Sequence, residues 1–186
     1  MPSPLADIIH PWHDFYVLVG TASATLVGLM FVAASIGAQV FTERNREAMR
    51  AFISPTVAHF TAVLFICIAA AIPSQTWLTL GVLLIVGGAA GMIQSARVLV
   101  QLFVRHSFAV DIIDRLFYAL IPIIGYLLVL GSAILLLERS QWSLEALALA
   151  LITLLVAGIR NAWDMTMWIV IRVPISVPET EKDSVS

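Results

Sequence analysis

Charged residues and cysteine are scarce in this chain, and their scarcity excludes several classes of protein. Only 12% of the 186 residues are Asp, Glu, Lys or Arg, about half the share found in water-soluble domains. The single cysteine, Cys67, excludes an intrachain disulfide and a cysteine-based metal motif. The net charge is -2 and no run of basic residues occurs, so we expect no nucleic-acid partner.

Common catalytic motifs are also missing. The sequence has no HExxH zinc motif, no GxSxG nucleophile elbow and no GxxxxGK phosphate loop. The first fourteen residues contain no Lys or Arg, whereas a secretory signal peptide begins with a basic region. We therefore expect the first apolar segment to be retained, and we predict neither enzymatic activity nor a cofactor.

Apolar residues, by contrast, make up 60% of the chain. They form five long runs, at about residues 14–41, 55–72, 77–104, 115–137 and 143–171. A helix of about 20 residues crosses the roughly 30 Å hydrocarbon core of a bilayer, and an open strand edge cannot be satisfied in lipid. The sequence therefore predicts an all-α integral membrane protein with a bundle of five transmembrane helices. Residues 1–13 form a short extracytoplasmic segment, and residues 174–186 a disordered cytoplasmic tail.

Residues that favour helix ends mark two of the boundaries. Ser54 followed by Pro55 is typical of an N-cap and a first helical residue, so we expect the second helix to begin there. The uncharged stretch from Ile72 to Gln75 is short and contains Pro73. It predicts a tight turn that makes the second and third helices an antiparallel hairpin.

Basic residues are distributed unequally between the two ends of the predicted bundle. One end carries Arg44, Arg46, Arg50, Arg105, Arg115, Arg172 and Lys182, and the other carries Arg139 alone. Trp12, Trp77 and Trp142 all fall at that second end, as interfacial aromatic residues do. Because basic residues favour the cytoplasmic side, we predict an external N-terminus, a cytoplasmic C-terminus and a bacterial inner-membrane location.

Small residues recur at four-residue spacing in two of the segments. Gly20, Ala24 and Gly28 lie in the first, and Gly87 and Gly91 lie in the third. Such spacing lets helix backbones approach closely. The contact could lie within one bundle or join copies of the chain into a homo-oligomer, and the sequence leaves both readings open.

Charged and polar side chains inside the apolar runs define a candidate binding site. Arg97 lies eight residues before Arg105, and Asp164 lies eight residues before Arg172, so the two fall at one depth in parallel helices. Counting eight residues from Arg50 reaches the neighbour of His59. We therefore predict a polar layer in the cytoplasmic half formed by His59, Arg97 and Asp164. About one turn further out lie Gln94, Arg160 and Asn161, and Tyr126 could lie near them.

Two interpretations of this layer stay open. Arg160 and Asp164 are i,i+4 neighbours, and Arg97 could compete for the same carboxylate, which would make an interhelical salt bridge that sets helix register. Alternatively, the layer lines a cavity that receives an anion, a lipid headgroup or a proton. If the pair is buried, Asp164→Ala should destabilise the fold more than Arg160→Ala, because it leaves two arginines without a counter-charge.

A second group of polar residues occurs near the N-terminus. His10, His13 and Asp14 are residue types that bind transition metals. Pro11 interrupts any helix there, and a closed zinc site needs four ligands. We therefore predict no metal site and interpret this segment as a membrane-surface cap.

Three functional hypotheses follow. The first is an oligomeric channel or transport unit for a small ion or solute, with the polar layer at its cytoplasmic mouth. The second is a non-catalytic membrane scaffold, assembly or accessory subunit. The third, a membrane enzyme, would depend on His59 and Asp164 as an acid–base pair.

Overall fold

Every described element of the chain is helical. The computed structural model describes residues 5–40, 43–104 and 112–172. Two short elements come first, α1 (Leu5–Ile9) and the 3-10 turn η1 (His10–Trp12). Five long helices follow: α2 (His13–Val40), α3 (Glu43–Ala71), α4 (Trp77–Val104), α5 (Ile112–Leu137) and α6 (Ser143–Arg172). The predicted all-α class is confirmed, whereas the predicted tail, residues 174–186, lies outside the described residues.

The helices have the length and composition that a bilayer requires. Within the described ranges, four apolar segments are long enough to cross a membrane: Asp7–Ser35, Trp77–Val100, Leu120–Leu137 and Ser143–Asp164. The apolar part of α3, Pro55–Ala71, is shorter. Large apolar side chains also cover the outside, with Leu18, Phe31 and Leu78 exposed by 70%, 64% and 66%. Such a surface would aggregate in water and fits a membrane protein.

One predicted boundary is wrong. We expected Ser54 and Pro55 to begin the second helix, but α3 begins at Glu43 and Pro55 lies inside it. The residues that precede Pro55 are mostly good helix formers such as Glu, Arg, Ala and Met, so the helix extends ahead of the apolar run. A proline inside a membrane helix is tolerated where its neighbours satisfy the freed backbone groups.

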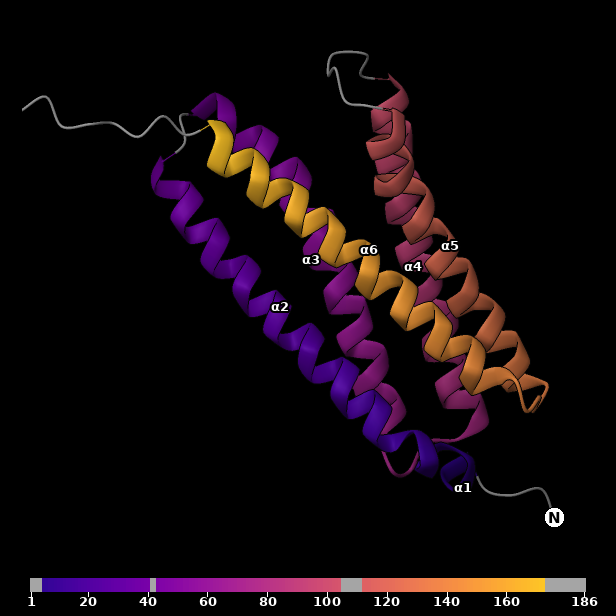
Figure 1. Ribbon diagram of the computed structural model, residues 1–186. Coiled ribbons are helices and arrows are strands. Elements are labelled where there is room, and N and C mark those ends of the chain that lie inside the picture. The colour runs from indigo at the N-terminus through magenta and orange to yellow at the C-terminus, as the bar shows by residue number, and fades with distance from the viewer. Residues whose placement is uncertain (1–4, 41–42, 105–111, 173–186) are drawn as a thin grey trace, which may run out of the picture.

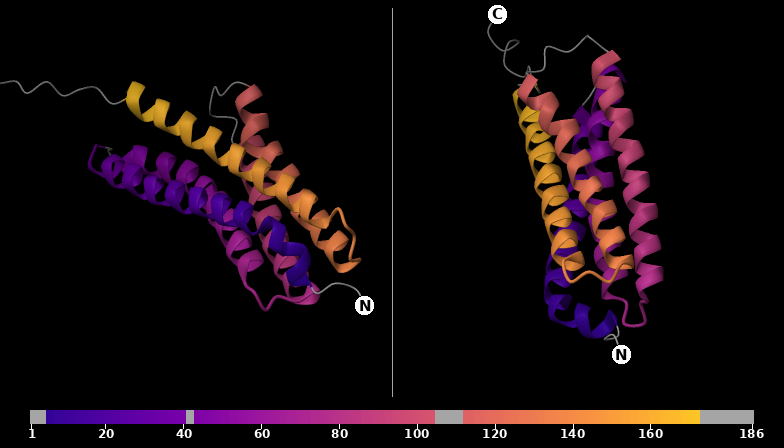
Figure 2. Two further views of the ribbon diagram at one scale, coloured as in Figure 1. Left: turned by 60° about the horizontal axis from the view of Figure 1, so that its bottom comes forward. Right: turned by 90° about the vertical axis from the view of Figure 1, so that its right-hand side faces the viewer.

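The five long helices form two groups that α6 joins. Figure 1 shows α2 and α3 side by side and the α4–α5 hairpin beside them. Helix α6 packs along α5 and also contacts α3 and α2, and α3 contacts α4. The ribbons converge at the end that carries α1 and the turns before α4 and α6, and they diverge toward the other end (Figures 1 and 2).

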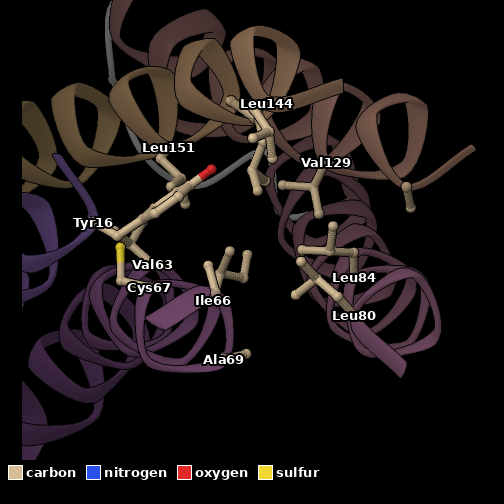
Figure 3. Close-up of a cluster of buried hydrophobic side chains, with 14 of the residues drawn as sticks. Tyr16, Val63, Ile66, Cys67, Ala69, Leu80, Leu84, Val129, Leu144 and Leu151 are labelled. Atoms are coloured by element: carbon tan, nitrogen blue, oxygen red, sulfur yellow. The ribbon is translucent and has the colours of Figure 1, made fainter. Parts of the chain in front are cut away.

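A large apolar cluster holds the converging end together. Figure 3 shows side chains from all five long helices, among them Tyr16, Val63, Leu84, Val129 and Leu151. The Tyr16 hydroxyl points into this cluster, and it has no hydrogen-bond partner among the described residues. Helix α1 closes the cluster from below, because Leu5 and Ile9 are buried in it.

The turn between α5 and α6 contains a backbone conformation that favours glycine. Arg139 has a φ of 57°. Its N–H donates to the carbonyl of Leu136 at 3.0 Å, and the N–H of Ser140 donates to the carbonyl of Leu135 at 2.8 Å. These bonds form the left-handed cap that often ends a helix. The Arg139 guanidinium lies 6.0 Å from the centre of the Trp77 ring, at the end of the molecule where the predicted aromatic belt lies.

Candidate functional site

A buried polar contact between the two helix groups joins His59 of α3 to Tyr126 of α5. Nδ1 of His59 lies 2.9 Å from the Tyr126 hydroxyl oxygen, and both side chains are 2% exposed. The two rings are 5.6 Å apart and tilted by 48°. A hydrogen bond with no competing water is costly to break on one side only, because the partner left behind stays buried and unsatisfied.

Gly91 of α4 makes this contact possible. A Cβ atom at position 91 would overlap the Tyr126 ring, so the phenol lies directly against the α4 backbone. Only glycine leaves that space, and the ring must occupy it for the hydroxyl to reach His59. The small-residue motif of this helix is therefore used inside one chain at Gly91, whereas nothing lies within 4 Å of a Cβ placed at Gly87.

Phe60, the residue next to His59, faces α2 and α6. The Phe60 ring lies against Gly158 of α6, where a Cβ atom would crowd it. The Ser23 hydroxyl of α2 donates to the Phe60 carbonyl at 2.7 Å. Adjacent residues of α3 thus bind different partners, with His59 toward α5 and Phe60 toward α2 and α6.

The small-residue motif of α2 is likewise used only in part. A Cβ atom at Gly20 would lie 3.1 Å from the Cβ of Cys67, so this glycine packs against α3. Ala24 is exposed, and no atom lies within 4 Å of a Cβ placed at Gly28. Contacts within the described chain therefore account for one end of the motif, and the homo-oligomer stays a prediction.

The predicted charged layer is not assembled. Nε of Arg160 lies 3.0 Å from Oδ2 of Asp164, and these side chains are 46% and 29% exposed. Arg97 is exposed and forms no ion pair with any residue that the structure describes. Helix α5 packs against both α4 and α6, which do not pack extensively on each other. Equal depth along two helices therefore does not bring Arg97 to Asp164.

The other predicted residues occupy two environments. Asn161 is buried, three residues after Gly158 and so on the α6 face that meets α3. Gln94 of α4 is half-buried. Of the six predicted binding residues, His59 and Asn161 therefore lie inside the protein, and the three charged ones lie toward its surface.

Two buried residues with hydroxyl groups were not among the predicted site residues. Thr56 precedes His59 by three residues, and Ser95 follows Gly91 by four, so each lies one turn from the His59–Tyr126 contact on the same helix face. The Ser95 hydroxyl has no hydrogen-bond partner among the described residues. Serine and threonine are common in membrane helices and often bond their own backbone, so their type alone gave no signal.

These buried polar residues extend from the contact toward one end of the molecule. Helix α3 runs opposite to α4 and α6 (Figure 1). A step back along α3 to Thr56 and steps forward along α4 to Ser95 and along α6 to Asn161 therefore lead the same way. That direction is toward the diverging ends, where α4 and α6 finish and α3 begins.

The N-terminal histidines offer no comparable arrangement. His10 and His13 are exposed, and the described part of the chain contains no group of three or more His, Cys, Asp or Glu side chains placed to hold a metal ion.

No protein-family model matches this chain, and no curated protein or solved structure resembles it significantly. The chemistry of the buried polar residues is therefore the evidence for function.

Proposed function

We propose that this chain is an integral protein of the bacterial inner membrane that assembles into a transport unit for a small ion or solute. The observation that carries this proposal is the buried His59–Tyr126 hydrogen bond at the junction of the two helix groups. Polar side chains are expensive inside a membrane protein, and they commonly mark the path or the binding site of a solute.

The placement of the polar residues supports an opening on the cytoplasmic side. Thr56, Ser95 and Asn161 lie on the side of the contact that leads to the diverging helix ends. In the sequence, most of the basic residues predicted to be cytoplasmic lie at or next to these same helix ends, which are the start of α3 and the ends of α4 and α6. The proposed orientation has the N-terminus outside, the converging end near the outer surface, and the exposed Arg97 and Arg160 near the inner surface.

A non-enzymatic role fits the geometry better than catalysis does. The membrane-enzyme hypothesis depended on His59 and Asp164 acting as an acid–base pair. Each of these residues has a different partner, Tyr126 for His59 and Arg160 for Asp164. An acid and a base that serve one reaction must both lie within hydrogen-bond reach of the substrate, and this pair does not meet.

A second function, as an accessory subunit of a membrane complex, is favoured by one separate observation. Ala24 and Gly28 leave a small-residue face of α2 open on the described chain. Small residues let a second helix approach closely, whether it belongs to another copy of this chain or to a different protein.

Flux measurements on purified protein in liposomes distinguish the two functions. We expect the wild-type protein to carry at least one of a panel of small ions and solutes above the rate of empty liposomes. Asp164→Asn and Arg97→Gln should reduce that rate, because they remove charge at the proposed entrance. Permeability equal to that of empty liposomes for the whole panel would contradict transport and leave the accessory role.

A further inference from the structure

No fixed charge is buried among the residues whose burial the structure describes. The buried polar side chains in this set belong to serine, threonine, histidine and asparagine, and none belongs to Asp, Glu, Lys or Arg. A bare metal cation or anion that entered this interior would leave water without a charge to compensate it. A proton also brings a charge into the interior, but it binds covalently to a neutral side chain, and hydrogen bonds to the charged group offset part of its loss of hydration.

Among the residues described as buried, His59 is the one whose residue type has an ordinary pKa near neutral pH. The other buried titratable residues, Tyr16 and Cys67, lie away from it. Cys67 is eight residues, or two turns, further along α3, and Gly20, one turn from Tyr16, packs against Cys67. Tyr126, which faces His59 from α5, is a neutral phenol. The buried polar residues Ser95 of α4 and Asn161 of α6 are neutral as well.

Proton uptake by His59 changes what its partner must do. In the neutral tautomer that carries hydrogen on Nε2, the Tyr126 hydroxyl donates to Nδ1. When a proton binds at Nδ1, the new N–H donates to the phenol oxygen, so the phenol hydrogen must turn to another acceptor. One N–H bond forms, no other covalent bond breaks, and the charge of the pair rises from 0 to +1.

The structure holds a candidate for that acceptor. The Ser95 hydroxyl is 2% exposed and has no partner among the described residues. It lies on the α4 face that carries Gly91, about 6 Å further along the helix axis, and the Tyr126 ring lies against Gly91. A buried hydroxyl without a partner is unfavourable, unless a second state of the protein gives it one.

We infer that the ion transported by this protein is a proton, which binds at the His59–Tyr126 pair. When the pair is protonated, the Ser95 hydroxyl oxygen accepts a hydrogen bond from the Tyr126 hydroxyl. This inference rests on the proposed transport function and names its substrate. The pair also joins α3 to the α4–α5 hairpin, so proton binding alters a bond between the two helix groups.

Proton entry into liposomes loaded with a pH-sensitive dye tests the inference, with valinomycin and potassium holding the membrane potential constant. Tyr126→Phe keeps the ring against Gly91 and removes only the hydroxyl, and Ser95→Ala removes only the proposed acceptor. Each should slow proton entry by about tenfold, the effect of losing one hydrogen bond in the conducting state. Thr153→Val is the matched control, because the exposed Thr153 hydroxyl bonds to Leu149 of its own helix at 2.7 Å. It should leave the rate unchanged.

Sodium, potassium and chloride uptake are measured on the same preparations. Proton entry that depends on Tyr126 and Ser95 supports the inference. Equal proton rates in all variants, or flux of another ion without proton flux, would overturn it and leave the transport function in place. If neither protons nor any other member of the panel enters faster than into empty liposomes, the transport function and the inference both fail.

Discussion

Nδ1 of His59 and the hydroxyl oxygen of Tyr126 lie 2.9 Å apart and connect two helices that are distant in sequence. Each of these residues follows a buried proline of its own helix by four positions, Pro55 in α3 and Pro122 in α5. Because proline has no N–H, each helix lacks one backbone hydrogen bond just before the contact. The hydrogen bond thus joins α3 and α5 one turn after the position where each helix lacks a backbone bond.

Removing a hydroxyl should have opposite effects at the two buried tyrosines. Tyr126→Phe leaves His59 buried without its partner and should lower the free energy of unfolding by about 1–3 kcal/mol. Tyr16→Phe removes a hydroxyl that has no partner among the described residues, so it should be neutral or stabilising by about 1 kcal/mol. Thermal unfolding in detergent measures both. Equal destabilisation by the two variants would show that the Tyr16 hydroxyl has a partner.

A methyl group added to α4 should matter at one glycine and not at its neighbour in the motif. Gly91→Ala forces the Tyr126 ring away and should cost about 1–3 kcal/mol of stability. Gly87→Ala meets no atom within 4 Å and should be neutral or stabilising by about 0.5–1 kcal/mol, because alanine favours helix. The same unfolding measurement compares them, and a tolerant Gly91 would mean that the ring does not pack against α4.

The ion pair of α6 should contribute little to stability. A buried layer would have made Asp164→Ala much more harmful than Arg160→Ala. The structure instead leaves both side chains partly exposed and pairs them within one helix turn, so each substitution should cost about 0.5 kcal/mol or less. Melting of the two single variants and of the double variant gives the coupling energy. If Asp164→Ala alone lowered the free energy of unfolding by several kcal/mol, the buried layer would be supported instead.

The turn after α5 should tolerate glycine better than arginine. At a φ of 57°, Arg139 adopts the left-handed conformation, which costs a non-glycine residue about 1–2 kcal/mol. Arg139→Gly removes that cost and loses a contact with Trp77 worth about 0.5 kcal/mol at an exposed site. We expect a net gain near 0.5–1 kcal/mol in detergent unfolding, and Arg139→Ala, which keeps the strain and loses the contact, should instead lower stability.

The predicted charged layer shows where reasoning from sequence stopped. Counting along α4 and α6 placed Arg97 and Asp164 at the same depth, because a helix advances a fixed distance per residue. The count says nothing about which way each side chain faces or which helix lies between. Helix α5 packs against both, and Asp164 bonds to Arg160 of its own helix.

The amino-acid sequence by itself determined the all-helical class and the apolar segments, because the length of an apolar run and the thickness of a bilayer are both one-dimensional quantities. It also singled out His59, the only histidine inside those segments. Only the tertiary structure decided that Tyr126 is its partner, that Gly91 provides the space and that the Ser95 hydroxyl has no partner in the part of the chain that the structure describes. Those facts depend on the rotation and lateral order of the helices, which side-chain packing sets after the helices have formed.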